Sequence, residues 1–146
     1  MLPQPLLYLS AFFERHRDDY YRLLLGVSQK GHWENWIRFF LRAVATQARD
    51  AIRRSDSLLS LWRDYRSRMQ EARASALLLQ LVDELFEYPA ITNRRAAEQL
   101  SITPRSAQLN LEKLVDAGIL QEATGRQRNR VYVAAEIIRI LEEREG

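Results

Sequence analysis

Apolar residues recur at helical spacing through the first half of the chain. The clearest run comprises Trp33, Trp36, Ile37, Phe40, Leu41, Val44, Ala48 and Ile52, and it predicts one face of a buried helix. Shorter runs predict a helix over 6–17 and another that begins at Asp18 and ends before Gly31. A further helix is expected to start at Asp56 and to bury Leu58, Leu61, Trp62, Tyr65 and Met69. We therefore predict an all-helical bundle with an aromatic-rich core.

The second half has shorter periodic segments, separated by turn residues. Large apolar groups thin out over residues 66–75, so we place a domain boundary there and expect domains 1–72 and 73–146. A helix over 76–88 should bury Leu77, Leu78, Leu81, Val82 and Leu85 and end at Pro89. Helices over 92–100 and 104–117, strands from Ile119 and Arg130, and a closing helix over 135–144 complete the pattern.

The two central helices have the signals of a helix-turn-helix. Thr92 and Thr103 are suitable N-cap residues, and Pro104 suits the first helical position after the second cap. Ile102 is the apolar residue expected to hold the turn between them, and Gly118 can end the second helix. The segment that follows, with a basic loop over 125–129, predicts a hairpin wing. The fold class is therefore predicted as mainly α, with an N-terminal helical bundle followed by a winged helix-turn-helix and a small β-hairpin wing.

Candidate DNA-binding residues follow from this arrangement. The core face of the second helix is formed by Ala107, Leu111, Leu114 and Val115, and the opposite face exposes Arg105, Leu109 and Glu112. The N-terminal residues of a recognition helix contact base edges, where Arg suits guanine and Gln suits adenine. The expected site comprises Arg95, Thr103, Arg105, Ser106, Gln108, Lys113, Arg126, Arg128 and Arg130, the wing arginines and Lys113 being assigned to phosphates. Double-stranded DNA is the expected partner.

Two features of the same helix favour other interpretations. An exposed Leu109 is a poor base reader, and Glu112 repels phosphate unless it lies at the edge of the groove. A protein target or self-association is therefore the alternative partner, since winged helices also serve as interaction modules. The basic wing is also explained by a plain solvated hairpin.

Charge and composition limit the function further. The net charge is +3, with 12 basic and 8 acidic residues in 1–71 against 10 and 11 in 72–146. The proposed DNA-binding half is not basic overall, but residues 94–130 contain 7 basic and 4 acidic residues. Cysteine is absent, which suits a reducing cytoplasm. Neither a signal peptide nor an apolar run long enough to span a membrane is evident, so no membrane partner is expected.

The residues of common catalytic and metal sites are missing. His16 and His32 have no second ligand at a useful spacing, and the glycines form no phosphate-binding loop. Neither Ser nor Thr has an evident base. We expect no catalytic residue, no metal ligand and no cofactor, so the chain as given is not expected to be an enzyme.

The first half resembles a known family. Residues 2–10 (LPQPLLYLS), the pair Tyr20 and Tyr21, and residues 31–41 (GHWENWIRFFL) are similar to the segment that follows the catalytic motif in bacterial Fic proteins. His32 stands where that family usually has Asp. The second half is similar to the winged helix that closes many of these proteins, so the resemblance covers essentially the whole chain.

The resemblance implies a function for the parent protein rather than for this chain. Fic proteins mostly transfer AMP from ATP to hydroxyl groups of target proteins, through the motif His-Pro-Phe-x-x-Gly-Asn-Gly-Arg. None of the four asparagines here lies between glycines, and neither histidine precedes Pro-Phe. The chain is therefore expected to be a non-catalytic C-terminal region of a Fic-type adenylyltransferase. Whether Met1 is a native start stays open, as does the alternative of a free-standing transcription regulator.

Overall fold

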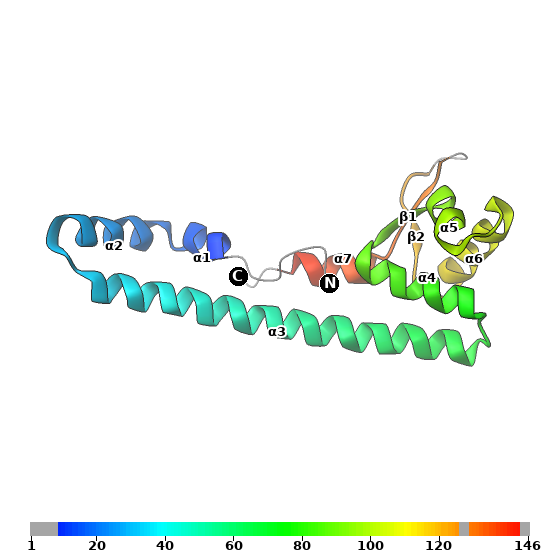
Figure 1. Ribbon diagram of the computed structural model, residues 1–146, viewed down its shortest axis with the longest axis horizontal. Helices are drawn as coiled ribbons and strands as arrows, with labels where there is room; N and C mark the ends of the chain where they lie inside the picture. The colour runs from blue at the N-terminus through cyan, green and yellow to red at the C-terminus, as the bar shows by residue number, and fades with distance from the viewer. Residues whose placement is uncertain (1–8, 126–128, 144–146) are drawn as a thin grey trace. The chain divides into compact units, whose positions relative to one another are not determined.

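The computed structural model describes residues 9–125 and 129–143 (Figure 1). Within these residues ten elements follow one another, and most of them are helices. Their bounds are α1 (Leu9–Arg15), α2 (Arg17–Lys30), α3 (Trp33–Glu71), α4 (Ala76–Glu87), β1 (Ala90–Thr92), α5 (Asn93–Leu100), α6 (Pro104–Asp116), β2 (Gln121–Glu122), β3 (Val131–Val133) and α7 (Ala135–Glu142). The predicted mainly helical class is confirmed, together with a small antiparallel sheet.

Helix α3 is continuous, so the prediction of a new helix at Asp56 is wrong. Its sequence contains neither Pro nor Gly, the two residues that most strongly interrupt a helix. Exposed ion pairs one turn apart join Glu34 to Arg38 over 2.7 Å and Asp64 to Arg68 over 2.6 Å, and pairs at this spacing favour the helix. Asp and Ser suit a helix start, but here nothing upstream ends the preceding helix.

The chain divides into two compact units, Met1–Ser55 and Asp56–Gly146. The division comes earlier than the expected boundary at residue 72. The reason is that Leu58, Tyr65 and Met69 of α3 belong to the hydrophobic core of the second unit. The last turns of α3 therefore pack as part of that unit.

The core of the first unit is small and aromatic. Phe12, Phe39 and Ala43 are its buried apolar residues, with Trp36 among the partly buried side chains around them. Ring centroids lie 5.6 Å apart for Phe12 and Phe39. The predicted buried row on α3 is wrong in part, because Trp33, Ile37, Phe40, Leu41 and Ile52 are exposed. The helix is rotated so that the row through Phe39 and Ala43 faces the core instead.

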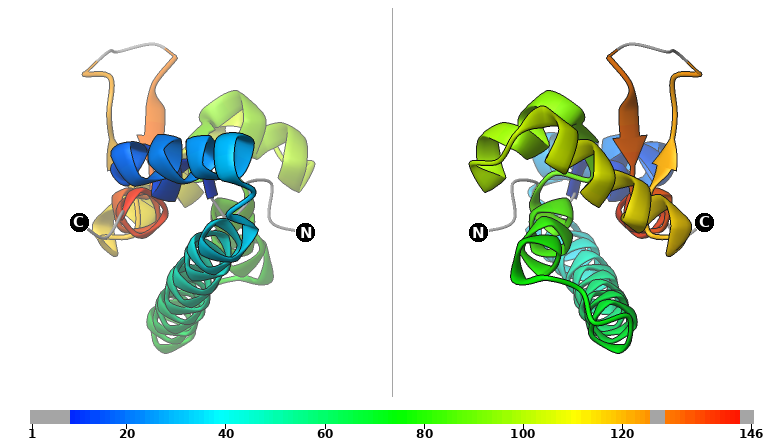
Figure 2. Two further views of the ribbon diagram at one scale, coloured as in Figure 1. Left: turned by 90° about the vertical axis from the view of Figure 1, so that its left-hand side faces the viewer. Right: turned by 90° about the vertical axis from the view of Figure 1, so that its right-hand side faces the viewer.

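The second unit contains a three-stranded antiparallel sheet with the order β1-β3-β2. Ile91 of β1 and Glu122 of β2 both pair with Tyr132, from either side of β3. Figure 2 shows β2 and β3 running alongside each other. Strand β1 was not predicted, because three residues are too few to establish an alternating pattern.

The strand expected from Ile119 begins two residues later, at Gln121. The backbone N–H groups of Ile119 and Leu120 both donate to the carbonyl oxygen of Leu114, over 2.9 and 3.1 Å. These two N–H groups therefore bond to a free carbonyl at the C-terminal end of α6 and take no part in pairing between strands. The side chains of Ile119 and Leu120 are both buried. Gly118 has a φ of 71°, the left-handed conformation expected of it.

The core of the second unit draws on all its helices and on β3. The predicted core residues Leu78, Leu81, Val82 and Leu85 of α4 are confirmed, whereas Leu77 is exposed. On α6, Ala107, Leu111 and Leu114 are buried and Val115 is partly buried, as predicted. Across the described parts of the chain, none of the helices combines the length and apolarity needed to cross a bilayer.

Candidate nucleic-acid interface

The turn between α5 and α6 is fixed by side-chain caps. The Oγ1 of Thr92 accepts from the N–H of Arg95 over 3.3 Å, and the Oγ1 of Thr103 accepts from the N–H of Ser106 over 3.2 Å. Pro104 occupies the first turn of α6. Ser101 takes a left-handed conformation, and the N–H of Ile102 donates to the carbonyl of Ala97. Thr103 therefore caps a helix start, and its hydroxyl is already engaged there.

Helix α6 presents a polar edge away from its core face. Arg105, Ser106 and Lys113 are exposed, as expected of residues that contact a ligand. Leu109 is also exposed, with 52% of its surface accessible. The prediction of which face of α6 is buried is thus confirmed, including the exposure of Leu109. These exposed side chains lie along the first three turns of the helix.

Gln108 has a more constrained position than the sequence indicates. Its Nε2 donates to the Tyr132 hydroxyl over 2.9 Å and to Oε1 of Glu112 over 2.9 Å. Tyr132 is buried at the centre of the sheet. The amide therefore joins α6 to β3, and both of its N–H groups are engaged.

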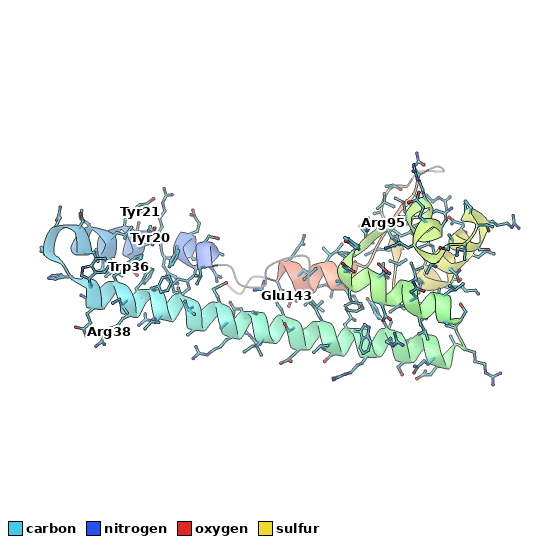
Figure 3. All side chains as sticks on the ribbon, in the orientation of Figure 1. Tyr20, Tyr21, Trp36, Arg38, Arg95 and Glu143 are labelled. Atoms are coloured by element: carbon cyan, nitrogen blue, oxygen red, sulfur yellow. The ribbon has the colours of Figure 1, made fainter. Side chains whose placement is uncertain are left out.

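Arg95 lies near the start of α5, where its side chain packs against Tyr88 rather than against α6 (Figure 3). Its guanidinium carbon lies 4.1 Å from the ring centroid of Tyr88, which is cation–π distance. Both side chains are exposed. Stacking of this kind orders the guanidinium at the protein surface.

The entry into the β2–β3 loop is ordered by Glu122. Its Oε1 accepts from the Thr124 hydroxyl, from the N–H of Thr124 over 2.8 Å and from the N–H of Gly125 over 2.9 Å. The Thr124 hydroxyl and N–H together lower the pKa of the Glu122 carboxyl. Arg130 is exposed at the far end of the loop, whereas Arg126 and Arg128 lie outside the described residues.

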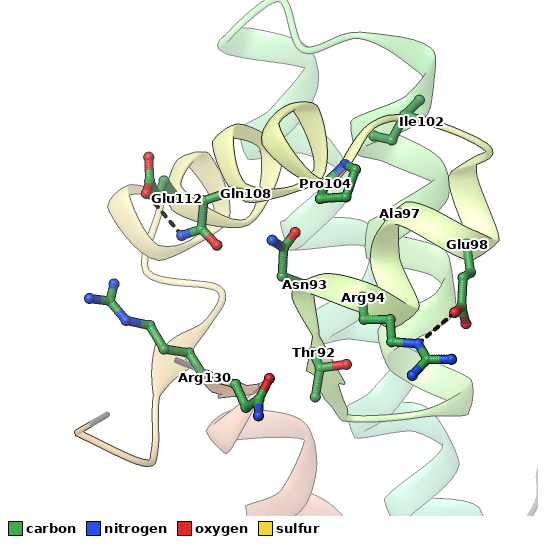
Figure 4. Close-up of a pocket in the computed structure, with 11 residues that line it drawn as sticks. Thr92, Asn93, Arg94, Ala97, Glu98, Ile102, Pro104, Gln108, Glu112 and Arg130 are labelled. Carbon is green, nitrogen blue, oxygen red and sulfur yellow. Dashed lines mark hydrogen bonds and ion pairs between the residues drawn. The ribbon is translucent and has the colours of Figure 1, made fainter. Parts of the chain in front are cut away.

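A cleft of about 1170 Å³ opens between the first turns of α5 and α6 and the start of β3 (Figure 4). Arg94 pairs with Glu98 over 2.8 Å on one side, and Gln108 bonds to Glu112 on the other. The cleft is lined by Thr92, Asn93, Arg94, Ala97, Glu98, Ile102, Pro104, Gln108, Glu112, Asn129 and Arg130. Its lining includes two arginines and two glutamates, so its formal charge is balanced.

Asn93 is a lining residue that the sequence did not single out. Its side chain is directed into the cleft from the first residue of α5 (Figure 4). Within the described chain, its Oδ1 is buried without a hydrogen-bond partner. Neither Asn93 nor Tyr132 has a sequence signal for this role, because the role depends on the packing of α5 and β3 against α6.

The expected site residues are therefore divided. Arg105, Ser106, Gln108 and Lys113 share α6, and Arg130 and Gln108 line the same cleft. Arg95 lies on α5 against Tyr88. The described residues contain no group of three or more His, Asp or Glu side chains placed to hold a metal ion. No protein-family model matches the chain.

Proposed function

We propose that residues 56–146 form a winged helix that binds double-stranded DNA, with α6 as the recognition helix and the β2–β3 hairpin as the wing. The proposal is supported by the order of the elements, in which a helix and a short strand precede a capped helix pair and a hairpin follows it. The strand between the first two helices pairs with the hairpin. This is the arrangement that a winged helix requires.

One observation supports the DNA-binding function most directly. Arg105, Ser106 and Lys113 are exposed on α6, and the Gln108–Tyr132 hydrogen bond fixes that helix against β3, which is the central strand of the sheet and the second strand of the hairpin. A fixed angle between helix and wing allows both to contact one duplex, the helix in the major groove and the wing on the backbone. The second unit has 13 basic and 14 acidic residues, so any affinity for DNA must be local.

The assignment of roles has changed for Gln108. Both donor groups of its amide are engaged within the protein, so it positions α6, and adenine recognition would require those bonds to break. Arg105 is left as the main candidate for base contact, in keeping with the preference of Arg for guanine. Lys113, Arg126, Arg128 and Arg130 are proposed phosphate ligands.

Duplex binding measured against salt tests this proposal. Affinity for a random duplex pool should fall steeply between about 50 and 200 mM salt, because phosphate contacts release counterions. Arg126→Ala with Arg128→Ala should weaken binding to all sequences, whereas Arg105→Ala should change which sequences are preferred. Arg63→Ala, which removes one exposed charge from α3, is the matched control for Arg105→Ala. The absence of duplex binding at the lowest salt would end the proposal.

A protein-binding module is the second candidate, and the exposure of Leu109 favours it. An exposed Leu next to Glu112 suits a protein surface better than a phosphate backbone. Leu109→Glu should then abolish capture of the protein target or self-association while the fold is retained. A monomer in sedimentation, with target capture unchanged by Leu109→Glu, would exclude this candidate.

We also propose that the chain is the C-terminal region of a Fic-type adenylyltransferase. The support is the pattern of residues 2–10 and 31–41 together with the order of helices and hairpin that follows. The gene sequence upstream of the Met1 codon distinguishes this from a free-standing transcription regulator. It should encode His-Pro-Phe-x-x-Gly-Asn-Gly-Arg, and an upstream stop codon in its place would favour the regulator.

A further inference from the structure

The first unit exposes a row of large apolar side chains along α3. Trp33, Ile37, Leu41 and Ile52 have 59%, 49%, 58% and 61% of their surface accessible. The spacing of the first three is four residues, so they follow one another along the helix surface. Single exposed apolar residues are ordinary, but three on successive turns of one helix, with Ile52 further along the same face, indicate a binding surface.

This row is distinct from the face of α3 that forms the core. At about 100° per residue, the core row through Trp36, Phe39 and Ala43 is centred roughly 120° around the helix from the exposed row. Gln47 continues the core row and is buried. Helix α3 thus has two apolar faces in this unit, of which α1 and α2 leave one open.

A row of arginines borders the exposed apolar row on its other side. Arg38, Arg42 and Arg49 are exposed and are centred about 110° from the apolar row. Arg38 also pairs with Glu34 over 2.7 Å, and both side chains are exposed. Residues 33–55 contain five arginines against Glu34 and Asp50, so this half of α3 is basic. The whole unit has nine basic and five acidic residues.

The combination of an apolar row with a basic border selects the kind of partner. We propose that this face of α3 docks an amphipathic helix of another protein, whose apolar stripe is bordered by Asp and Glu. The apolar row supplies the buried contact, and the arginines favour a partner of opposite charge. A second copy of the chain fits poorly, because antiparallel pairing of two such faces would place the arginine rows side by side.

The test uses the full chain and a displayed library of helical peptides. Selected peptides should have apolar residues three or four positions apart and a negative net charge. Synthetic copies of these peptides are then titrated against the protein and three variants. Ile37→Ser with Leu41→Ser should weaken binding at least tenfold, and Arg42→Glu with Arg49→Glu should shift the preference to peptides of positive charge. Leu77→Ser, which changes an exposed leucine on α4, is the matched control and should leave binding unchanged.

Each alternative occupant gives a different result. Selected peptides without acidic character, or an unchanged affinity of the Ile37→Ser, Leu41→Ser variant, would overturn the proposal. A concentration-dependent dimer in sedimentation that Ile37→Ser with Leu41→Ser abolishes would assign the face to a second copy. Binding to vesicles of anionic lipid with no selected peptide would assign it to a membrane surface. Circular dichroism of each variant confirms that the helices are retained.

Discussion

The Nε2 of Gln108 donates a hydrogen bond to the Tyr132 hydroxyl over 2.9 Å and thereby joins α6 to the central strand of the sheet. The two residues are 24 positions apart. Tyr132 is almost fully buried, so its hydroxyl needs a partner within the protein. This contact sets the position of the proposed recognition helix relative to the proposed wing.

The removal of either partner of this bond should destabilise the second unit. Tyr132→Phe and Gln108→Ala are each expected to reduce the free energy of unfolding by about 0.5–1.5 kcal/mol. The double variant should cost less than the sum of the single changes, because both remove the same bond. Urea unfolding of the four proteins measures this coupling. Strictly additive effects would show that the bond contributes nothing.

Tyr65 makes a second long-range contact, which anchors the end of α3 in the second unit. Its buried hydroxyl donates to Oε2 of Glu136 on α7 over 3.0 Å. Tyr65→Phe should therefore lower the free energy of unfolding by about 1.5–3 kcal/mol, since the bond is to a charged acceptor. Tyr65→Ala, which also leaves a cavity, should cost more, about 3–5 kcal/mol. An unchanged free energy of unfolding in Tyr65→Phe would contradict a role for the hydroxyl.

The same residue predicts a loss of stability in alkali. Burial, followed by the hydrogen bond to Glu136, raises the pKa of Tyr65 in the folded protein above its ordinary value of 10. The unfolded chain therefore loses the Tyr65 hydroxyl proton at a lower pH than the folded protein does. The free energy of unfolding consequently keeps its full value below about pH 10 and falls as the pH rises further. Tyr65→Phe should flatten the decline in urea midpoints above pH 10. If the urea midpoint of Tyr65→Phe declines with pH as steeply as that of the unchanged protein, the decline belongs to other titrating groups.

The N-cap of α6 should account for a measurable part of the stability of the helix pair. Thr103→Ala removes the oxygen that accepts from the N–H of Ser106, and about 1 kcal/mol of unfolding free energy should be lost. Thr103→Ser retains the oxygen and is the matched control. If the Ala and Ser variants unfold at the same urea concentration, the cap has no energetic role.

The loop between β2 and β3 should lose order in acid. Hydrogen bonds from Thr124 lower the pKa of the Glu122 carboxyl in the folded protein. The stabilisation of the loop by the Glu122 carboxylate is therefore fully present above the ordinary pKa of about 4.5, and it is lost as the pH falls through the lowered pKa. The amide signals of Thr124 and Gly125 should move with that titration in NMR spectra. Glu122→Gln should remove the pH dependence of both signals, and its persistence would point to another group.

Much of this architecture is encoded in local patterns. Thr92, Thr103, Pro104 and Gly118 located the ends of α5 and α6 because capping depends on neighbouring residues alone. The long α3 was divided wrongly because Asp56 and Ser57 resemble a helix start, and only the absence of a stop signal before them argues for continuity. Strand β1 has three residues, and its existence depends on pairing with β3 far along the chain.

The sequence predicted which side chains of the candidate site are exposed, but it did not predict the hydrogen bonds that they make. Periodicity gave the exposed edge of α6 with Arg105 and Leu109, since a helix has fixed geometry. The hydrogen bond from Gln108 to Tyr132 and the burial of the Asn93 Oδ1 depend on how α6, α5 and β3 meet, which no local pattern specifies. The open apolar row on α3 was assigned to the core for the same reason, because periodicity identifies an apolar face but not the element that covers it.

The most direct test of the DNA-binding proposal is an NMR titration of the full chain with a short duplex at low salt. Amide signals of residues 103–113 and of Asn129 and Arg130 should shift, and signals of α2 should remain in place. Added salt should reverse the shifts, as expected for contacts to phosphate. Unchanged signals along α6 at saturating duplex, or shifts confined to residues 9–55, would contradict the account.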